Sequence, residues 1–455
     1  MTAALSRRSK RVAAGVRASR AKLRGRLRRP LRGLRPCRAA QPPARASPLR
    51  LATLAVVAGS RLLVLGAGPA QLGLLRAARE RGLFVTACDR DPLAPGFEYA
   101  DRRAIVSAED EEGLDRLARA EPVDGIVAPG IDWPVAIAAR LAERLGLPHP
   151  ISGETAVLAV SKLRQRVRFA EAGVLQPRYE LASSPSEAEL AAERLGYPCV
   201  VKAPDRQGQR GLSRVDGSGQ LAGAVELAVD ASRSGACLLE ELVQGQEVTV
   251  NAFSIDGRFH ALTVTDRVTA PPSAFGVALA HVWPAQRGVR AAERLARRAV
   301  EALGIENGPT YTQIVLGPEG PRVMEVAARL GGGHDAELAQ LAVGVDLNGL
   351  TLAAALGESL EKPRPRGRGG ACVRFLVAPQ GELADVRGLQ EAAAVEGVAE
   401  VRVYRRAGWV FGPLTRGADR AGSVLAAGRS RAEALERADR AAQLVQFVTA
   451  DAEVA

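Results

Sequence analysis

From residue 61 onward, short apolar runs alternate with stretches that place their apolar residues on one helical face. The run at 61–65 has the length and composition of a buried strand, and a glycine-containing turn leads from it into a helix ending near residue 81. Regular alternation of strands and helices is typical of a parallel sheet covered by helices. Further strands are predicted at 84–88, 104–106 and 125–128, and amphipathic helices at 109–120 and 133–145.

After residue 150 the pattern changes towards longer, paired strands. Asp256-Gly257 predicts a tight hairpin turn, and a second hairpin is predicted where 310–316 returns through 317–320 into 321–326. A segment rich in proline and glycine at 362–370 then breaks the pattern and precedes a small α+β unit. The remaining strands predicted in this part are 199–202, 213–215, 236–240 and 246–255.

A length of 455 residues is too great for one core and predicts two or three domains. The predicted fold class is α/β, with a parallel α/β domain first and a small α+β domain last. The predicted boundaries are a basic tail at 1–58, the α/β domain at 59–150, a middle domain at 151–361 with a lid at about 183–245, and the α+β domain at 370–455.

The net charge of +12 is concentrated at the amino terminus. Residues 1–60 contain 14 Arg and 2 Lys without any acidic residue, so the rest of the chain carries a net charge of −4. The basic segment fits a disordered tail that attracts nucleic acid, a transit peptide, or a translated upstream region if the true start lies near Val56 or Val57. Because the charge is confined to this segment, nucleic acid is not the expected partner of the folded part.

The five cysteines form no CxxC motif or Cys/His cluster, so a reducing, cytoplasmic location is expected. The apolar run at 49–58 is too short for a membrane span and is interrupted by Arg50, and no membrane partner is expected.

The first turn has some features of a dinucleotide-binding loop. Gly66, Gly68 and Gly73 lie between a strand and a helix, and Asp89 ends the next strand. However, the third glycine of that fingerprint belongs at position 71, where this chain has Gln71. We therefore interpret the loop as a tight packing turn, with an anion-lining role as the alternative and an NAD(P)-dependent oxidoreductase as the least favoured function.

Charged residues at strand ends and in loops point instead to nucleotide chemistry. Lys202 ends a buried strand, where an unpaired ammonium would be costly and a phosphate would remove that cost. The following loop contains Gly208 and Gly211, which leave backbone N–H groups free to approach phosphate oxygens. Glu240 and Glu247 lie at the two ends of a short connector, where carboxylates can accept hydrogen bonds from adenine and ribose.

The second predicted hairpin has the ligands of a magnesium site. Gln313 and Glu325 lie on its opposite arms, and Mg²⁺ that bridges phosphates needs only one or two protein oxygens. Arg329, in the glycine-rich turn beyond, can neutralise charge on a transferring phosphoryl group.

This ordered set of residues resembles the ATP-grasp superfamily over residues 60 to 450, most closely its L-amino-acid ligase and carbamoyl-phosphate-synthase-like members. The resemblance implies an ATP-grasp fold with a pre-ATP-grasp domain, ATP and Mg²⁺ as cofactors, and small carboxylate and amine substrates. It implies ATP-binding roles for Lys162, Lys202, Gly208, Gly211, Glu240, Val243 and Glu247, metal-binding roles for Glu325 and Gln313, and catalytic roles for Arg329 and for His281, which could also be structural.

Two positions depart from the pattern of the superfamily. Its first metal ligand is usually Glu, where this chain has Gln313, and an Asn usually follows two residues after the second Glu, where this chain has Ala327. The expected activity is ATP-dependent ligation of a carboxylate, such as an amino acid, to an amine through an acyl phosphate. Bicarbonate activation and nucleotide binding with weakened catalysis stay as alternatives, and the identity of both substrates, the number of metal ions and a homodimer are left open.

Overall fold

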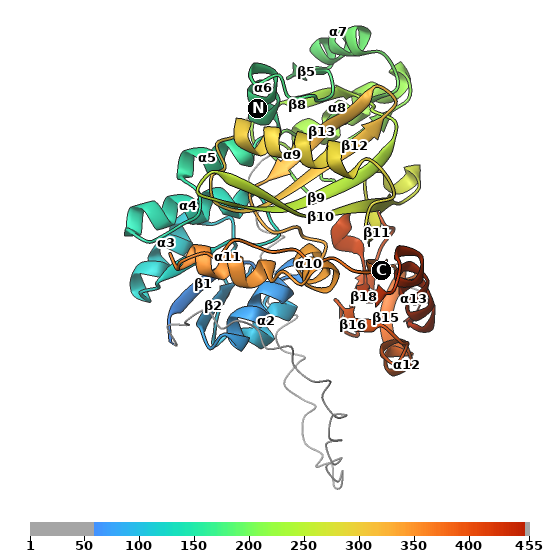
Figure 1. The fold of residues 1–455 in the computed structure, drawn as a ribbon. Helices are drawn as coiled ribbons and strands as arrows, with labels where there is room; N and C mark the ends of the chain where they lie inside the picture. Colours follow the sequence, from blue (N-terminus) through green and yellow to red (C-terminus); the bar gives the residue numbers. More distant parts are fainter. Residues whose placement is uncertain (1–58, 451–455) are drawn as a thin grey trace, which may run out of the picture. The chain divides into compact units, whose positions relative to one another are not determined.

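The apolar run that opens the folded part forms the centre of a parallel sheet. The structure is a computed structural model and describes residues 59–450, so the three interpretations of the basic segment 1–58 lie outside the described residues. The sheet has the order β3-β2-β1-β4, and its two inner strands, β1 and β2, are labelled in Figure 1. Its strands are β1 (Arg61–Leu65), β2 (Phe84–Cys88), β3 (Arg102–Ala104) and β4 (Gly125–Val127), and its helices are α2 (Leu72–Glu80), α3 (Glu111–Ala120) and α4 (Trp133–Leu145).

One predicted strand of this sheet was misplaced. The apolar residues at 104–106 favoured a strand there, but β3 pairs with β2 over Arg102–Ala104 and ends at Ala104. Ile105 is 55% exposed, so its apolar side chain does not mark a buried strand position. An apolar run of three residues is too short to locate a strand at the edge of a sheet.

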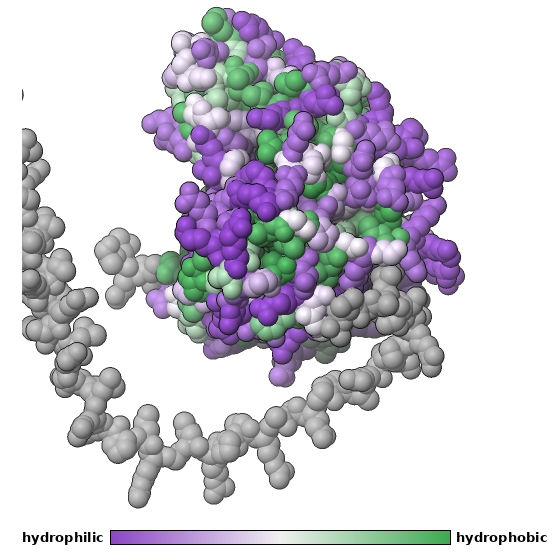
Figure 2. All heavy atoms as spheres, turned by 90° about the vertical axis from the view of Figure 1, so that its left-hand side faces the viewer, coloured by the Kyte–Doolittle hydropathy of each residue, from purple (hydrophilic) through white to green (hydrophobic). Residues whose placement is uncertain are grey.

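Helices α3 and α4 cover one side of the sheet and expose charged residues outward. Glu112 and Arg116 of α3 are exposed, whereas Leu114 and Ala118 are buried. Figure 2 shows this side of the molecule, where hydrophilic side chains predominate and interrupt smaller hydrophobic areas. Within residues 59–450, no helix is both long and apolar enough to cross a membrane.

The segment predicted as a lid contains a second, antiparallel sheet with its own core. Its strand order is β5-β8-β6-β7, and it starts at Tyr179, slightly before the predicted lid boundary. Helices α7 (Pro185–Leu195) and α8 (Leu221–Ala231) bury an apolar cluster against it. Its strands are β5 (Tyr179–Ala182), β6 (Cys199–Lys202), β7 (Leu212–Val215) and β8 (Cys237–Glu241).

The largest sheet has eight strands and joins the middle of the chain to its carboxyl-terminal part. The order is β13-β12-β9-β10-β11-β14-β18-β16, with β11 and β14 antiparallel. The predicted α+β domain therefore continues the sheet of the middle domain, although the linker separates the two in sequence. The strands are β9 (Gln246–Ile255), β10 (Arg258–Thr269), β11 (Ala278–Trp283), β12 (Gly308–Gly317), β13 (Gly320–Ala327), β14 (Gly370–Leu376), β16 (Val398–Val403) and β18 (Gly422–Gly428).

Helices complete the layers around these sheets. Helix α11 lies against α2 of the first sheet, and the two share an apolar cluster with α10 and β14. A three-stranded sheet, β17-β15-β19, closes the carboxyl-terminal part. The remaining elements are α5 (Gly153–Ala159), α6 (Lys162–Glu171), α9 (Val289–Ala302), α10 (Asp335–Val343), α11 (Leu347–Ala355), α12 (Leu389–Ala393), α13 (Arg431–Leu444), β15 (Gly381–Arg387), β17 (Val410–Phe411) and β19 (Gln446–Ala450), with short 3-10 turns η1 (Pro69–Gln71), η2 (Pro95–Tyr99), η3 (Ser218–Gln220), η4 (Pro272–Ala274) and η5 (Gly417–Asp419).

Gly73 allows α2 to approach the largely enclosed Glu337 of α10, whose side chain is 9% exposed. A methyl group at Gly73 would lie 2.0 Å from the Glu337 carboxylate, which is bonded to Arg402. We expect Gly73→Ala to lower the free energy of unfolding by about 1–3 kcal/mol because the packed carboxylate must move. Urea denaturation followed by fluorescence measures this effect.

Gly223 provides the matched control for this prediction. It lies in α8, and a methyl group there would meet no atom within 4 Å. Gly223→Ala should be neutral or stabilising by up to about 1 kcal/mol, because alanine favours helix. Equal stability of the two variants would contradict the packing role of Gly73.

Candidate active site

The second hairpin brings the two predicted metal ligands side by side. Gln313 on β12 and Glu325 on β13 are directly paired in the antiparallel register. The Lys162 ammonium, in the first turn of α6, lies 3.0 Å from the Glu325 carboxylate. Burial opposes ionisation of Glu325, but Lys162, Lys202 and Arg329 together outweigh it, so the pKa of Glu325 lies below its usual value. The hairpin therefore presents an ionised carboxylate and an amide next to a lysine.

Lys202 and Glu240 form a buried group with Arg166. The Lys202 ammonium and the Arg166 Nε each lie 2.7 Å from the Glu240 carboxylate, one on each oxygen. Burial lowers the pKa of Lys202 to about 8, although Glu240 opposes this shift. The two cations overcome the effect of burial on Glu240 and lower its pKa to about 2. The costly buried ammonium that the sequence predicts thus has a carboxylate as its protein partner.

Glu247 of β9 links Arg267 of β10 to Gln313 of the hairpin. Its Oε2 accepts hydrogen bonds from Arg267 Nη1 at 2.6 Å and from Gln313 Nε2 at 2.9 Å. The Gln313 amide nitrogen is thereby held by Glu247. Val243 lies half-buried in the connector between β8 and β9, close to the turn of the hairpin at Gly317.

The loop at 205–211 contacts both the first α/β part of the chain and the carboxyl-terminal part. Gln207 accepts a hydrogen bond from the backbone N–H of Asp132, and Gln209 Oε1 accepts one from the N–H of Gly417 at 3.0 Å. Gly208 has a φ of +66°, which favours glycine. Gly211 packs against α8, where an added methyl group would lie 2.8 Å from Ala231. Gly208 lines the cavity described below. The absence of a side chain at Gly211 lets the loop lie close against α8.

Arg329 and His281 are each held by a buried aspartate that sequence reasoning missed. Arg329 Nε and Nη2 lie 2.7 and 2.6 Å from Asp132 Oδ1, and Asp132 raises the pKa of Arg329 although burial opposes this. His281 Nδ1 lies 3.0 Å from Asp335 Oδ1. Asp335 also accepts hydrogen bonds from Asn251 and from the N–H of Gly333. Its pKa lies below the usual value because His281, with these two donors, outweighs burial.

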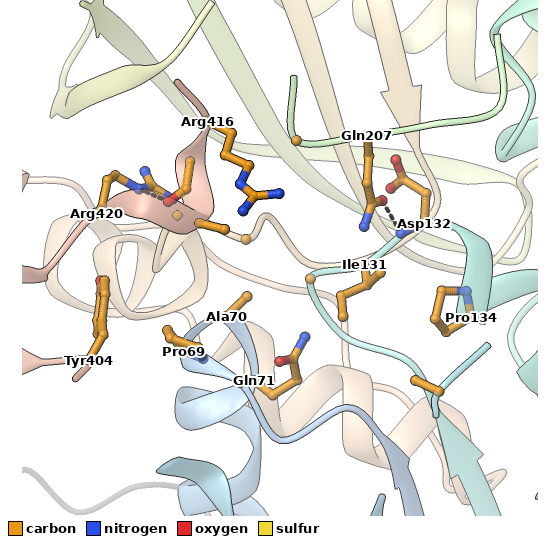
Figure 3. A pocket seen from close by; sticks show the side chains of 18 of the residues that line it. Pro69, Ala70, Gln71, Ile131, Asp132, Pro134, Gln207, Tyr404, Arg416 and Arg420 are labelled. Carbon is orange, nitrogen blue, oxygen red and sulfur yellow. Dashed lines mark hydrogen bonds between the residues drawn. The ribbon is translucent and has the colours of Figure 1, made fainter. Parts of the chain in front are cut away.

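A cavity of about 590 Å³ lies between the hairpin and the loop at 205–211, with Gln207 and Asp132 on one side and Arg416 and Arg420 on another (Figure 3). Its walls come from the first sheet, the loop at 205–211, the hairpin and the carboxyl-terminal part. Its lining contains five of the predicted site residues: Gly208, His281, Gln313, Glu325 and Arg329. The other predicted residues, Lys162, Lys202, Gly211, Glu240, Val243 and Glu247, are not part of its lining.

The glycine turn after β1 also lines this cavity, but it is not built as a dinucleotide site. Asp89, which would hold a ribose in such a site, accepts a hydrogen bond from the N–H of Ala67 at 2.9 Å. Gln71 is buried against Gly66 and donates to the Pro129 carbonyl at 2.7 Å. The turn is therefore held by its own side chains, as the packing interpretation predicts.

The oxygen atoms of the hairpin side chains determine whether a magnesium ion fits this site. Within residues 59–450, no three His, Cys, Asp or Glu side chains form a group that could hold a metal ion by themselves. Glu325 and Gln313 offer a carboxylate and an amide on paired strands, which suits an ion that also binds phosphate oxygens and water.

Comparison with known proteins agrees with this architecture. Residues 167–329 match the model of the ATP-grasp domain, and residues 374–450 match that of the L-amino acid ligase C-terminal domain 2. The formate-dependent phosphoribosylglycinamide formyltransferase of Synechococcus sp. (strain RCC307) is 30% identical over 414 residues, which cover 84% of this chain and 96% of that protein.

Two solved structures share the fold. The L-amino acid ligase from Bacillus licheniformis superimposes with a TM-score of 0.74 at 23% identity, covering 87% of this chain and all of that one. The N5-carboxyaminoimidazole ribonucleotide synthetase from Thermotoga maritima gives a TM-score of 0.66 at 21% identity, covering 86% of this chain and all of that one. The chain belongs to the ATP-grasp superfamily and is an ATP-dependent ligase of its carboxylate–amine branch.

Proposed function

We propose that this ligase joins a small carboxylate, such as an amino acid, to an amine through an acyl-phosphate intermediate. The observation that carries the proposal is the convergence of Glu325, Gln313, Arg329 and His281 on one cavity, with Lys162 paired to Glu325. The match of the carboxyl-terminal part to the L-amino acid ligase model supports an amino acid as the carboxylate. The proposal places the reaction in the cytoplasm and leaves open whether the enzyme is a homodimer.

In the first step, a carboxylate oxygen attacks the γ-phosphorus of ATP, the bond from this phosphorus to the bridging oxygen breaks, and ADP leaves. Lys162 and Lys202 neutralise phosphate charge in this proposal, and Arg329 faces the carboxylate and the transferring group. Asp132 fixes the guanidinium plane of Arg329 through its two short contacts. Held in place before the reaction, these cations need little reorganisation when charge develops.

Glu325 and Gln313 are the residues that would hold Mg²⁺. When bound, the ion neutralises charge on the phosphate oxygens. Lys162 and the ion would then share the Glu325 carboxylate, and Gln313 would use its amide oxygen while Glu247 holds its nitrogen. Because the Glu240 carboxylate is already bonded to Arg166 and Lys202, contact with an adenine edge would fall to the connector backbone around Val243.

In the second step, the amine attacks the acyl carbon, the bond from carbon to the phosphate oxygen breaks, and the amine loses a proton. In this proposal His281 receives that proton on Nε2, because its other ring nitrogen, Nδ1, is bound by Asp335. The loop at 205–211, held by Gln207 and Gln209, shields the intermediate from water in this proposal.

A phosphate-release assay on the full-length chain with ATP and Mg²⁺ tests the proposal. Pools of amino acids, formate and bicarbonate serve as carboxylates, each with and without added amines. We expect release that requires an amino acid and an amine together, with one ADP formed per amide. Release that depends on formate or bicarbonate alone would favour a different donor, as the name of the Synechococcus relative suggests for formate. Absence of carboxylate-dependent release would contradict the proposal.

A further inference from the structure

Three arginines of the unit formed by β5 to β8 converge on one carboxylate of the first α/β part. Arg206 and Arg210 belong to the loop at 205–211, and Arg233 follows α8 of the same unit. Arg233 Nη2 lies 2.5 Å from Glu109 Oε2, and Arg206 Nη1 and Arg210 Nη2 lie 4.0 and 3.9 Å from the same carboxylate. In the part of the chain that the structure describes, Glu109 is the only acidic side chain within ion-pair distance of any of the three.

The two segments that carry these arginines are tied together. The Asp205 carboxylate accepts hydrogen bonds from the backbone N–H groups of Arg233 and Ser234 at 3.0 and 2.9 Å. The Arg206 side chain donates to the Ala231 carbonyl at the end of α8. The loop and the segment after α8 therefore present their three guanidinium groups as one body.

The other contacts of this body with the first α/β part are polar or cation–π contacts. The Arg233 Cζ lies 4.0 Å from the centre of the Trp133 ring at the start of α4. Gln207 accepts a hydrogen bond from the N–H of Asp132, as Figure 3 shows. Within residues 59–450, the apolar cluster of the β5 to β8 unit draws on residues 182–239 and on none from the first α/β part. Contacts of this kind contribute little individually, so they can form and break readily.

Glu109 counters repulsion between like charges at this junction. Burial lowers the pKa of the Arg210 guanidinium, and the neighbouring Arg206, Arg233 and Arg90 lower it further, whereas Glu109 opposes the shift. Arg90 follows β2 of the first α/β part, so its charge repels the loop from the side on which Glu109 attracts it. Without the Glu109 charge, repulsion would outweigh attraction between the loop and this part of the chain.

The position of this loop matters for the site. Glu109, Gln207 and Arg210 line the cavity, and the Lys162 ammonium donates to the Arg206 carbonyl at 2.5 Å. The contact with Glu109 therefore fixes a segment that covers the cavity and touches a lysine assigned to the phosphates.

We infer that Glu109 is a positioning residue that holds the loop at 205–211 over the cavity while the acyl phosphate exists. This inference rests on the proposed function, which supplies the intermediate. Loss of the Glu109 charge lets the loop move away and admits water. Water that attacks the acyl phosphate releases the free carboxylate and phosphate, so ATP is consumed without formation of an amide.

The ratio of phosphate released to amide formed tests the inference in the full-length enzyme. We expect this ratio to lie near one in wild type and to rise at least about twofold in Glu109→Gln, because water competes with the amine. Glu112→Gln is the matched control, since its side chain is 91% exposed and lies 3.9 Å from Arg116 within α3. It should keep the ratio of wild type. A wild-type ratio in Glu109→Gln would overturn the inference.

A double-mutant cycle with Arg233 tests whether Glu109 acts through the arginines. Arg233→Gln removes the guanidinium that lies nearest to Glu109 and should also raise the ratio of phosphate to amide. We expect the double variant Glu109→Gln/Arg233→Gln to show a ratio no higher than that of Glu109→Gln alone, because the contact is already lost. Effects of the two substitutions that multiply independently would contradict this pairing.

Hydrogen exchange separates failure of this inference from failure of the proposed function, because it requires no turnover. Exchange of the backbone N–H groups at 203–212 is followed by mass spectrometry with ADP and Mg²⁺ present. We expect it to be at least about threefold faster in Glu109→Gln than in wild type or Glu112→Gln, with exchange in β9 unchanged.

The outcomes of the exchange measurement are distinct. Unchanged exchange at 203–212, or an equal acceleration in β9, would overturn the role of Glu109 even if ligation occurs. Faster exchange confined to the loop, in an enzyme that forms no amide with any donor, would support the contact and contradict only the proposed function.

Discussion

Substitution of Glu325 by alanine is expected to lower ATP-dependent phosphate release by at least about 10²- to 10³-fold. Glu325 is the ionised carboxylate of the hairpin, paired with Gln313 across the strands and with Lys162 at 3.0 Å. Its loss removes the principal proposed metal ligand and leaves Lys162 without its acidic partner. The rate of phosphate release with saturating ATP and Mg²⁺ measures the effect.

Glu319 offers a control on the same hairpin. It lies at the turn, its side chain is 86% exposed, and its contact is with the neighbouring Arg322. Glu319→Ala should keep wild-type turnover, and Glu325→Gln, which preserves the size of the side chain, should be nearly as inactive as Glu325→Ala. Turnover of Glu325→Ala within about twofold of wild type would be incompatible with its metal-binding role.

Substitution of Arg166 by leucine is expected to destabilise the protein by about 3–5 kcal/mol. The Arg166 side chain is 1% exposed and donates to Glu240 and to the Met324 carbonyl, each at 2.7 Å. Removal of the guanidinium leaves the buried Glu240 with Lys202 alone and leaves a backbone carbonyl of the hairpin strand β13 without its partner. The urea midpoint of unfolding, followed by tryptophan fluorescence, measures the loss.

Arg168 is the matched control on the same helix. Its side chain is 48% exposed and pairs with Glu171 at 2.8 Å near the end of α6. Since exposed ion pairs contribute little, Arg168→Leu should change stability by less than about 1 kcal/mol. Similar midpoints for the two variants would show that the Arg166–Glu240–Lys202 group does not stabilise the junction of lid and hairpin.

The sequence allows accurate prediction of elements whose signals are local. The hairpin that carries Gln313 and Glu325 could be located because turn residues separate two apolar runs, and its register brings the two side chains together. Lys202 could be recognised as a residue that needs a negative partner because it ends a buried strand. Glu240 is that partner in the structure, 38 residues further along the chain.

Other features depend on contacts that no local pattern reveals. Asp132 and Asp335 orient Arg329 and His281 across sequence separations of 197 and 54 residues, and neither aspartate lies in a distinctive motif. Asp132 follows the carboxyl end of a parallel strand, a position where site residues gather, and this was the available signal. The pairing of β11 with β14 across the linker likewise depends on tertiary packing.

Transfer of ¹⁸O from the carboxylate to phosphate tests the central claim most directly. The full-length enzyme is incubated with ATP, Mg²⁺, an amino acid labelled in both carboxylate oxygens, and an amine acceptor, and the released phosphate is analysed by mass spectrometry. An acyl phosphate predicts one ¹⁸O atom in each phosphate released with amide formation, because the attacking carboxylate oxygen leaves with the phosphorus. Amide formation accompanied by unlabelled phosphate would contradict the account.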